Sequence, residues 1–205
     1  MDAVIVAGGI PQPDEPLYAY SNGGSKALID IGGKPMVQWV LDALGEAKTV
    51  ERVVVVGLTD KAGLSCTKPL TFLSNQGKLL ENLKAGTAKV LELHPKAEHV
   101  LFVSSDIPAI TGAMVDWVVK TCLETRDDLY YNAIRRESME AVFPTSRRTY
   151  TRLKDMELCG GPGAGDQSLY QRSGGNTHSE CADGPGKKRR QNGSGSPENS
   201  GSQDQ

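Results

Sequence analysis

The stretch "AVIVAGG" at residues 3–9 decides the fold of this chain. An unbroken run of small and β-branched apolar residues ends abruptly in Gly8 and Gly9. Such a run is typical of a short strand that is buried on both faces of a parallel sheet. Glycines directly after the strand let the backbone turn sharply and approach a ligand closely. We therefore expect a central strand here, with a binding loop at its carboxyl end.

Two further apolar runs, "RVVVVG" (52–57) and "HVLFVS" (99–104), repeat the pattern. Apolar residues at helical spacing lie between and after these runs. The expected helix faces are Met36, Val37, Val40, Leu41 and Leu44, then Leu79, Leu80, Leu83, Val90 and Leu91, then Met114, Val115, Val118, Val119 and Cys122 after a Thr111 N-cap. Strands that alternate with helices predict an α/β fold, with a mostly parallel central sheet flanked by helices. The β-prone stretches 129–134, 140–144 and 149–153 are candidates for antiparallel strands added at one side of the sheet.

The composition changes sharply near Cys159. From there to the last residue the chain has no Val, Ile, Met or Phe, and Leu169 is its one large aliphatic residue. Such a segment cannot bury enough apolar surface to offset its conformational entropy. We therefore predict a folded domain over residues 1–161, incomplete at its C-terminal end, and a disordered Gly/Ser-rich tail over 162–205. The abrupt change at Pro162 also suggests a tail translated from a shifted reading frame.

Composition excludes several classes of protein. A net charge of −2 and a pI near 5.9 give no general attraction to nucleic acid or to membranes. No apolar run reaches the roughly 18 residues of a membrane span, and the N-terminus lacks the features of a signal peptide. The four cysteines are scattered without zinc-site spacing, which favours free thiols in a reducing compartment. We expect a cytoplasmic protein, with neither nucleic acid nor membrane as a partner, and exposed loop histidines at positions 94, 99 and 178.

Two common phosphate-binding motifs do not fit the glycines. The Rossmann fingerprint runs from its glycines directly into a helix, whereas Gly9 is followed by Ile-Pro-Gln-Pro. The stretch "GGKPM" (32–36) has Pro35 where a P-loop needs a magnesium-binding Ser or Thr. A different signal is "SSDIPAI" (104–110), which delivers Asp106 at the carboxyl end of the third apolar run. That carboxylate is suited either to a hard cation such as Mg²⁺ or to a simple turn.

The order of these motifs is more specific than any one of them. The series AGG (7–9), KAL (26–28), GGKPM (32–36), VVVVG (53–57) and SDIP (105–108) resembles the nucleotidyltransferase superfamily with the GT-A-type fold, which contains nucleotide-diphospho-sugar transferases. Within it, the chain is most similar to the MobA-like NTP transferase domain. The resemblance covers about residues 2–161.

The resemblance implies a role for each matching residue. Ala7, Gly8 and Gly9 correspond to the loop that contacts the base and ribose of the nucleotide. Lys26 corresponds to a catalytic residue that contacts the triphosphate, and Asp106 to the catalytic carboxylate that binds Mg²⁺. Asn75, Gln76 and Gly77 occupy a place of further nucleotide contacts. Lys34 is a weaker candidate than Lys26 for the phosphates.

The chain also departs from the pattern of its relatives. Many of them carry an arginine shortly before the lysine, and residues 10–25 contain none. Tyr18 or Tyr20 in this loop could stack on a base, although a loop aromatic that simply packs against its neighbours is the more common case. Arginines cluster later in the chain and could hold an anionic acceptor or simply lie on the surface: Arg135, Arg136, Arg147, Arg148 and Arg152.

The resemblance implies a Mg²⁺-dependent nucleotidyltransferase. It would transfer NMP from an NTP to a phosphorylated small-molecule acceptor and release pyrophosphate. The acceptor alternatives are a sugar phosphate, an alcohol phosphate or molybdopterin. A glycosyltransferase of the same fold is a second interpretation, although Ser104 stands where such enzymes usually have the first acid of Asp-x-Asp. A nucleotide-binding or regulatory module without turnover is a third.

Overall fold

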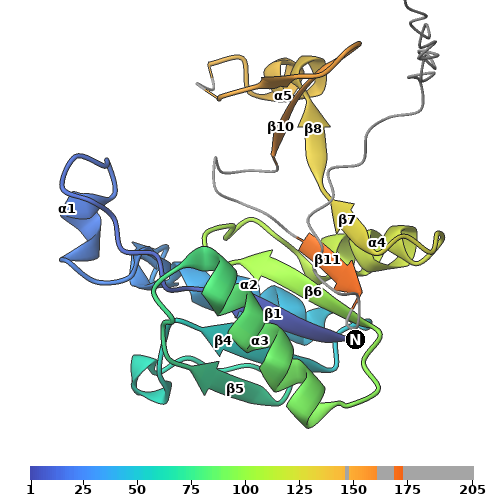
Figure 1. The fold of residues 1–205 in the computed structure, drawn as a ribbon. Helices are drawn as coiled ribbons and strands as arrows, with labels where there is room; N and C mark the ends of the chain where they lie inside the picture. Colours follow the sequence, from blue (N-terminus) through green and yellow to red (C-terminus); the bar gives the residue numbers. More distant parts are fainter. Residues whose placement is uncertain (146–147, 161–168, 173–205) are drawn as a thin grey trace, which may run out of the picture. The chain divides into compact units, whose positions relative to one another are not determined.

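The strand at residues 2–6 lies at the centre of the protein. The structure is a computed structural model that describes residues 1–145, 148–160 and 169–172, the last four by backbone alone. Strand β1 (Asp2–Val6) pairs in parallel with β4 (Arg52–Val56) and with β6 (His99–Ser104), and β4 pairs in parallel with β5 (Leu70–Leu73). The six-stranded sheet has the order β5-β4-β1-β6-β11-β7. The predicted α/β fold with a mostly parallel central sheet is confirmed (Figure 1).

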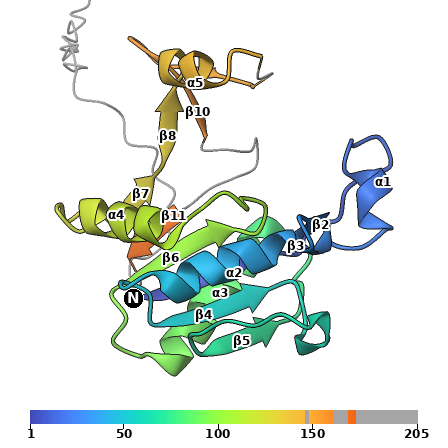
Figure 2. The same cartoon turned by 180° about the vertical axis from the view of Figure 1, so that it is seen from behind.

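Helices cover both faces of this sheet. Helices α2 (Met36–Glu46) and α4 (Gly112–Cys122) lie on one face, and α3 (Leu79–Leu93) lies on the other (Figures 1 and 2). Side chains alternate along β1, so that Ala3 and Ile5 join the cluster under α2 and α4, while Val4 joins the cluster under α3. All three are fully buried, as expected of a strand covered on both sides.

Helices α2 and α4 follow the sequence pattern closely. All five predicted apolar residues of α2 are buried, and Pro35 precedes its first residue. In α4, Val115, Val119 and Cys122 are buried, whereas Met114 is 54% exposed. The hydroxyl of Thr111 accepts a hydrogen bond from Met114 N at 3.3 Å, which confirms the predicted N-cap.

Helix α3 buries only part of the predicted face, because Val90 is fully buried and Leu83 packs against the core, but the first two leucines do not. Its buried residues are Asn82, Gly86 and Val90, whereas Leu79 and Leu80 are 52% and 59% exposed. Gly86 is the reason, because a Cβ at this position would lie 2.4 Å from Val4 Cγ1. The helix therefore packs on the sheet through its narrowest side. The prediction of a leucine-lined buried face over Leu79 and Leu80 is wrong.

The second half of the chain adds antiparallel strands to the sheet and a smaller sheet of its own. Strand β11 (Leu169–Arg172) pairs with β6 and with β7 (Leu129–Tyr131), both antiparallel. Strands β8 (Ala133–Arg135), β10 (Glu157–Gly160) and β9 (Thr151–Arg152) form a separate antiparallel sheet in that order. The strands expected at 129–134 and 149–153 are thus present, although only β7 belongs to the central sheet.

Two expectations for this half require correction. The stretch 140–144 is not a strand, because helix α5 spans Arg136–Val142 and is supported by an i,i+4 ion pair between Arg136 and Glu140 at 2.7 Å. The predicted disordered tail over 162–205 includes residues 169–172, whose backbone instead pairs with the edge of β6. The rest of 162–205, including His178, lies outside the described residues.

Short elements connect the larger ones. They are α1 (Tyr18–Ser21), the 3₁₀ helices η1 (Lys26–Leu28) and η2 (Asp60–Ala62), and the paired strands β2 (Asp30–Ile31) and β3 (Lys34–Pro35). Among the described helices, none combines the length and apolar character that a bilayer crossing requires.

Candidate functional site

Lys26 and Asp106 meet at the carboxyl edge of the sheet, although 80 residues separate them in the chain. The ammonium group of Lys26 donates to Asp106 Oδ2, and the hydroxyl of Ser104 donates to Asp106 Oδ1. The side chains are 32% and 18% exposed, so the ion pair is partly buried but open to solvent. The two residues that the sequence singled out for phosphate and metal binding are therefore direct neighbours.

The loop between Gly9 and Lys26 is closed at its base. Lys26 N donates to Gly9 O at 2.9 Å, and Ser25 Oγ donates to Ala7 O at 2.6 Å. Ser25 also caps η1, because its hydroxyl accepts from Ala27 N at 3.2 Å. These bonds fix the backbone of Lys26 against the end of β1. The position of Lys26 therefore does not depend on how residues 10–24 of the loop pack.

An asparagine network fixes the glycine turn from the opposite side. Asn75 Nδ2 donates to Gly8 O at 3.0 Å, and Asn75 Oδ1 accepts from Gly77 N and from Asn82 Nδ2 at 2.9 and 3.1 Å. Asn82 in turn accepts from Gln76 N at 2.7 Å and is only 4% exposed. A Cβ on Gly8 would lie 2.7 Å from the amide of Asn75, so this close approach requires glycine.

A cavity of about 180 Å³ opens between these two supports. Its walls come from the ends of β1 and β6, from the start of α3 and from η1. The lining residues include Gly8, Gly9, Lys26, Gly77, Asn82 and Ser104. Leu79 and Leu83 also line it, which gives the exposed Leu79 a place outside the core. The cavity combines main-chain groups, one cation and an apolar wall, as a nucleotide site needs.

A second, larger cavity of about 610 Å³ lies beyond Asp106. It is lined mainly by apolar side chains from the segment after β6, from α4 and from the connection of β7 to β8. They include Ile107, Pro108, Met114, Trp117, Val118 and Ile134. Val103 lines both cavities, Lys26 lines the first and Asp106 lines the second. The ion pair therefore stands between two spaces that could each hold a reactant.

The structure does not bring every predicted residue to the first cavity. Ala7 is fully buried, and its main chain is engaged on both sides, by Val56 O at 2.8 Å and by Ser25. Gln76 turns its side-chain amide to Ser74 O at 2.8 Å. Neither residue lines the cavity, and neither do Tyr18 and Tyr20. These residues support the loops or lie on the surface.

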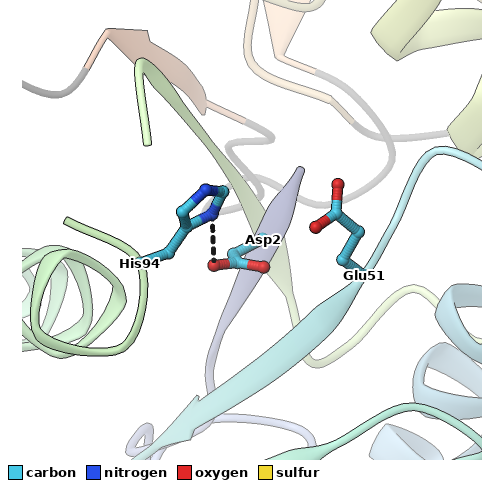
Figure 3. A group of neighbouring side chains, drawn as sticks. All are labelled: Asp2, Glu51 and His94. Carbon is cyan, nitrogen blue, oxygen red and sulfur yellow. Dashed lines mark ion pairs between the residues drawn. The ribbon is translucent and has the colours of Figure 1, made fainter. Parts of the chain in front are cut away.

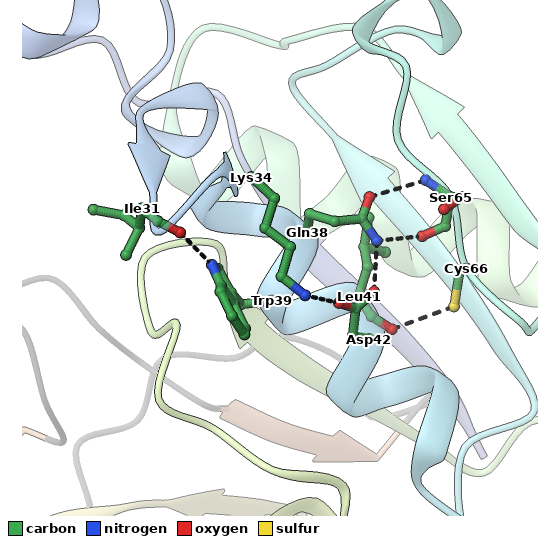
Figure 4. Close-up of polar contacts among 8 residues, drawn as sticks. All are labelled: Ile31, Lys34, Gln38, Trp39, Leu41, Asp42, Ser65 and Cys66. Atoms are coloured by element: carbon green, nitrogen blue, oxygen red, sulfur yellow. Dashed lines mark hydrogen bonds and ion pairs between the residues drawn. The ribbon is translucent and has the colours of Figure 1, made fainter.

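Lys34 is engaged elsewhere, on helix α2. Its ammonium group pairs with Asp42 and lies 3.6 Å from the centre of the Trp39 ring (Figure 4). Burial opposes ionisation of Asp42, but hydrogen bonds from Lys34 and Gln38 outweigh it and lower the pKa of Asp42. Lys34 is thus part of an ion pair that resembles Lys26–Asp106 chemically but lines neither cavity.

Of the arginines that could hold an acceptor or lie on the surface, the four that the structure describes, Arg135, Arg136, Arg148 and Arg152, line neither cavity. Arg136 pairs with Glu140 at 2.7 Å and with Glu157 at 2.9 Å, and its guanidinium lies 5.1 Å from the centre of the Tyr150 ring. Its function in the structure is to join α5 to β10. Arg147 lies outside the described residues.

A glycine turn, a lysine and an aspartate meet at the carboxyl ends of parallel strands. Comparison of the sequence with models of known protein families agrees with this arrangement. A sequence model of the MobA-like NTP transferase domain matches residues 3–176. The chain belongs to this family. The resemblance inferred from the motifs is confirmed, and the match extends past residue 161 to include β11.

Curated relatives of this MobA-like domain act on different acceptors. A probable molybdenum cofactor guanylyltransferase of Thermococcus sibiricus is 30% identical over 101 residues, which cover 48% of each chain. A 3-deoxy-manno-octulosonate cytidylyltransferase of Vibrio campbellii is 29% identical over 131 residues, which cover 62% of this chain and 50% of the relative. The chain thus spans about half the length of these curated relatives.

A solved structure also resembles the domain. It is described as a hypothetical transferase of Thermus thermophilus, has a TM-score of 0.64 and 34% identity, and covers 82% of this chain and 63% of its own.

Sequence reasoning missed two members of the site. The pattern around Asn82 predicts an exposed residue, because polar residues in an amphipathic helix usually face solvent. Ser104 differs from the acid of an Asp-x-Asp motif, and nothing in the sequence indicates its hydrogen bond to Asp106. One signal was available for Asn82: it lies four residues before Gly86 and eight before Val90, and these three residues form the buried side of α3.

Proposed function

We propose that this MobA-like domain is a Mg²⁺-dependent nucleotidyltransferase that transfers NMP from an NTP to a phosphorylated small-molecule acceptor. The pairing of Lys26 with Asp106 between two cavities is the observation that carries the proposal. In the reaction, an acceptor phosphate oxygen forms a bond to the α-phosphorus, and the bond from that phosphorus to the β-phosphate oxygen breaks. Pyrophosphate leaves with the electron pair of the broken bond.

We assign the nucleotide to the first cavity. Gly8 and Gly9 allow the backbone to approach the base and ribose, and Asn75 holds Gly8 in place. Gly77 lines the same cavity and can supply a further main-chain contact. Lys26 is within reach of phosphates that extend from this cavity toward Asp106, and its charge would offset the charge that develops on the leaving pyrophosphate.

Asp106 is the residue that would hold the cation. Its oxygens are the hard ligands that Mg²⁺ prefers, and 18% of its side chain is exposed at the edge of the second cavity. When bound, Mg²⁺ supplies charge neutralisation on the phosphates. Ser104 and Lys26 orient the carboxylate. No general base is needed for this reaction, because a phosphate acceptor is already an anion at neutral pH.

We assign the acceptor to the second cavity, next to Asp106. Its apolar walls favour an acceptor that combines a phosphate with an apolar or ring-shaped body, and Trp117 offers a face for stacking. A sugar phosphate, an alcohol phosphate and molybdopterin remain the acceptor classes to compare.

The proposal is tested by adding each of the four NTPs with Mg²⁺ and measuring both thermal shift and pyrophosphate release over a panel of phosphorylated acceptors. We expect one NTP to raise the melting temperature and to release pyrophosphate with a subset of acceptors. Asp106→Asn should abolish the Mg²⁺-dependent part of the shift, whereas Asp42→Asn, which removes the other lysine-paired aspartate, should keep it. Binding without release would favour a nucleotide-binding module, and no stabilisation by any NTP would refute the proposal.

A further inference from the structure

A second group of metal-ligating side chains lies at the opposite edge of the sheet. Asp2 begins β1, Glu51 immediately precedes β4, and His94 immediately follows α3 (Figure 3). One ligand atom from each residue lies within 4.8 Å of the other two. Because parallel strands place their amino ends together, this group is remote from Asp106, which follows the carboxyl end of β6.

The buried carboxylate of Asp2 is the unusual feature of this group. Asp2 is only 1% exposed, and neither of its oxygens accepts a hydrogen bond in the described part of the chain. His94 Nδ1 lies 3.5 Å from Asp2 Oδ2, and among the described residues this ring nitrogen is itself buried without a hydrogen bond. A buried carboxylate without compensating contacts is costly, so native proteins usually pair it with a cation or a metal.

Glu51 supplies a second carboxylate and the route from solvent. Its side chain is 61% exposed, and one oxygen accepts from the Met1 amino group at 2.8 Å. A carboxylate has a second oxygen, so contact with the amine leaves a ligand free for a cation.

We propose that Asp2, Glu51 and His94 bind one divalent transition-metal cation of the Zn²⁺ type. A set of two carboxylates and one imidazole provides three protein ligands, and a fourth position can be filled by water. The imidazole distinguishes this site from the Mg²⁺ site proposed at Asp106, because Mg²⁺ prefers oxygen ligands alone. The bound cation would satisfy the orphaned oxygens of Asp2 and tie β1, β4 and α3 together at the edge remote from the nucleotide. The inference does not depend on the proposed transferase activity.

The test is Zn²⁺ binding to the full chain, measured by calorimetry and by the melting temperature, with excess Mg²⁺ present. We expect one Zn²⁺ per chain and a higher melting temperature. His94→Gln and Glu51→Gln should each weaken binding by more than about tenfold, since they remove a direct ligand. The matched controls His99→Gln and Glu98→Gln should bind as the wild type does.

The design separates the proposal from its competitors. Asp2→Asn is avoided as the primary variant because this residue is fully buried, whereas His94 and Glu51 are partly exposed. Cysteine thiols could also bind Zn²⁺, but that binding would survive in His94→Gln. The proposal is overturned if Zn²⁺ does not bind saturably, if Mg²⁺ displaces it, or if His94→Gln binds no more weakly than His99→Gln.

Discussion

Two lysine–aspartate pairs in this protein have the same chemistry but different surroundings. Lys26–Asp106 stands between two cavities, whereas Lys34–Asp42 is attached to helix α2. Lysines of both pairs are about one-third exposed, so each pair contributes little to folding, about 1 kcal/mol or less. The location of Lys26–Asp106, and not the strength of its ion pair, therefore makes it a candidate for catalysis. Lys34–Asp42 serves as an internal control.

Lys26→Met should separate catalysis from stability. We expect kcat to fall by about 100-fold or more, because a charge facing the leaving pyrophosphate is lost. The unfolding free energy should change by less than about 1 kcal/mol, since the pair is partly exposed. Lys34→Met should leave kcat close to that of the wild type. Steady-state pyrophosphate release and urea unfolding provide the two readouts, and equal losses of activity in both variants would contradict the site assignment.

Asn82→Leu should weaken nucleotide binding from a buried position. The substitution leaves Gln76 N without its acceptor and removes the hydrogen bond to Asn75 that steadies Gly8. An orphaned buried donor costs about 1–3 kcal/mol, so both the unfolding free energy and the NTP affinity should fall. Glu92→Leu, at a position of α3 that is 66% exposed and lines neither cavity, serves as a control that should affect neither quantity. If Asn82→Leu bound NTP as tightly as the wild type, the asparagine network would be irrelevant to the site.

At the scale of elements, the sequence predicted what depends on local periodicity. Helix α2 was predicted correctly because its buried side is made of large apolar residues at helical spacing. The face of α3 was predicted only in part, because its packing depends on the lack of a side chain at Gly86, and Leu79 lines a cavity instead of the core. Lys26 and Asp106 could be placed at one edge because each follows a strand, but the Asp2–His94 contact depends on where α3 ends in space.

Gly86→Ala should destabilise the protein although it improves helix propensity. Alanine gains about 1 kcal/mol over glycine in a helix interior. The added methyl group would lie 2.4 Å from Val4 Cγ1, and overpacking of a core typically costs about 1–3 kcal/mol. We expect a net loss in urea unfolding, with Lys84→Ala on the exposed side of α3 close to neutral. A more stable Gly86→Ala variant would show that α3 can move away from the sheet at no cost.

Asp116 gives the attachment of α4 a defined pH dependence. Burial opposes its ionisation, but hydrogen bonds from Thr49 Oγ1 at 2.7 Å, Thr49 N at 2.8 Å and Lys48 N at 3.1 Å prevail and lower its pKa. The unfolded chain then binds more protons, so this contribution is complete above the unfolded carboxyl pKa near 4 and is lost as pH falls through the lower folded pKa.

Urea unfolding between pH 6 and pH 2.5 measures this contribution. The difference in unfolding free energy between the wild type and Asp116→Asn should be largest near pH 6 and shrink as the pH falls below about 4. Glu51 titrates in both proteins, so its effect cancels in the difference. If the difference in unfolding free energy stayed constant over this range, the charge of Asp116 would not contribute to stability.

At the scale of the whole molecule, the first strand of the chain finds both of its partners far away in the sequence. Residues 2–6 of β1 pair with residues 52–56 and with residues 100–104, so the centre of the sheet cannot form locally. The sequence revealed this topology because a run buried on both faces requires parallel neighbours. It did not reveal β11, since pairing at the edge of β6 needs backbone groups more than apolar side chains.

This topology predicts slow folding. Long loops must close before β1 gains its partners, so we expect refolding in milliseconds to seconds rather than microseconds. Trp39 on α2 and Trp117 on α4 provide fluorescence probes for stopped-flow measurements. Ile5→Val should cost about 0.5–1.5 kcal/mol and slow the folding arm of the chevron if β1 pairs in the transition state. Submillisecond refolding, or an effect confined to the unfolding arm, would contradict this order of events.

The resting contact between Lys26 and Asp106 has a thermodynamic consequence for the proposed transferase. A triphosphate that draws Lys26 away releases Asp106 for a cation, and a cation that takes Asp106 releases Lys26 for a triphosphate. Each ligand therefore raises the affinity of the protein for the other. Thermodynamic reciprocity requires the two affinities to rise by the same factor. Because of this ion pair, the protein binds the cation or the triphosphate weakly when either is alone and binds the two together more tightly.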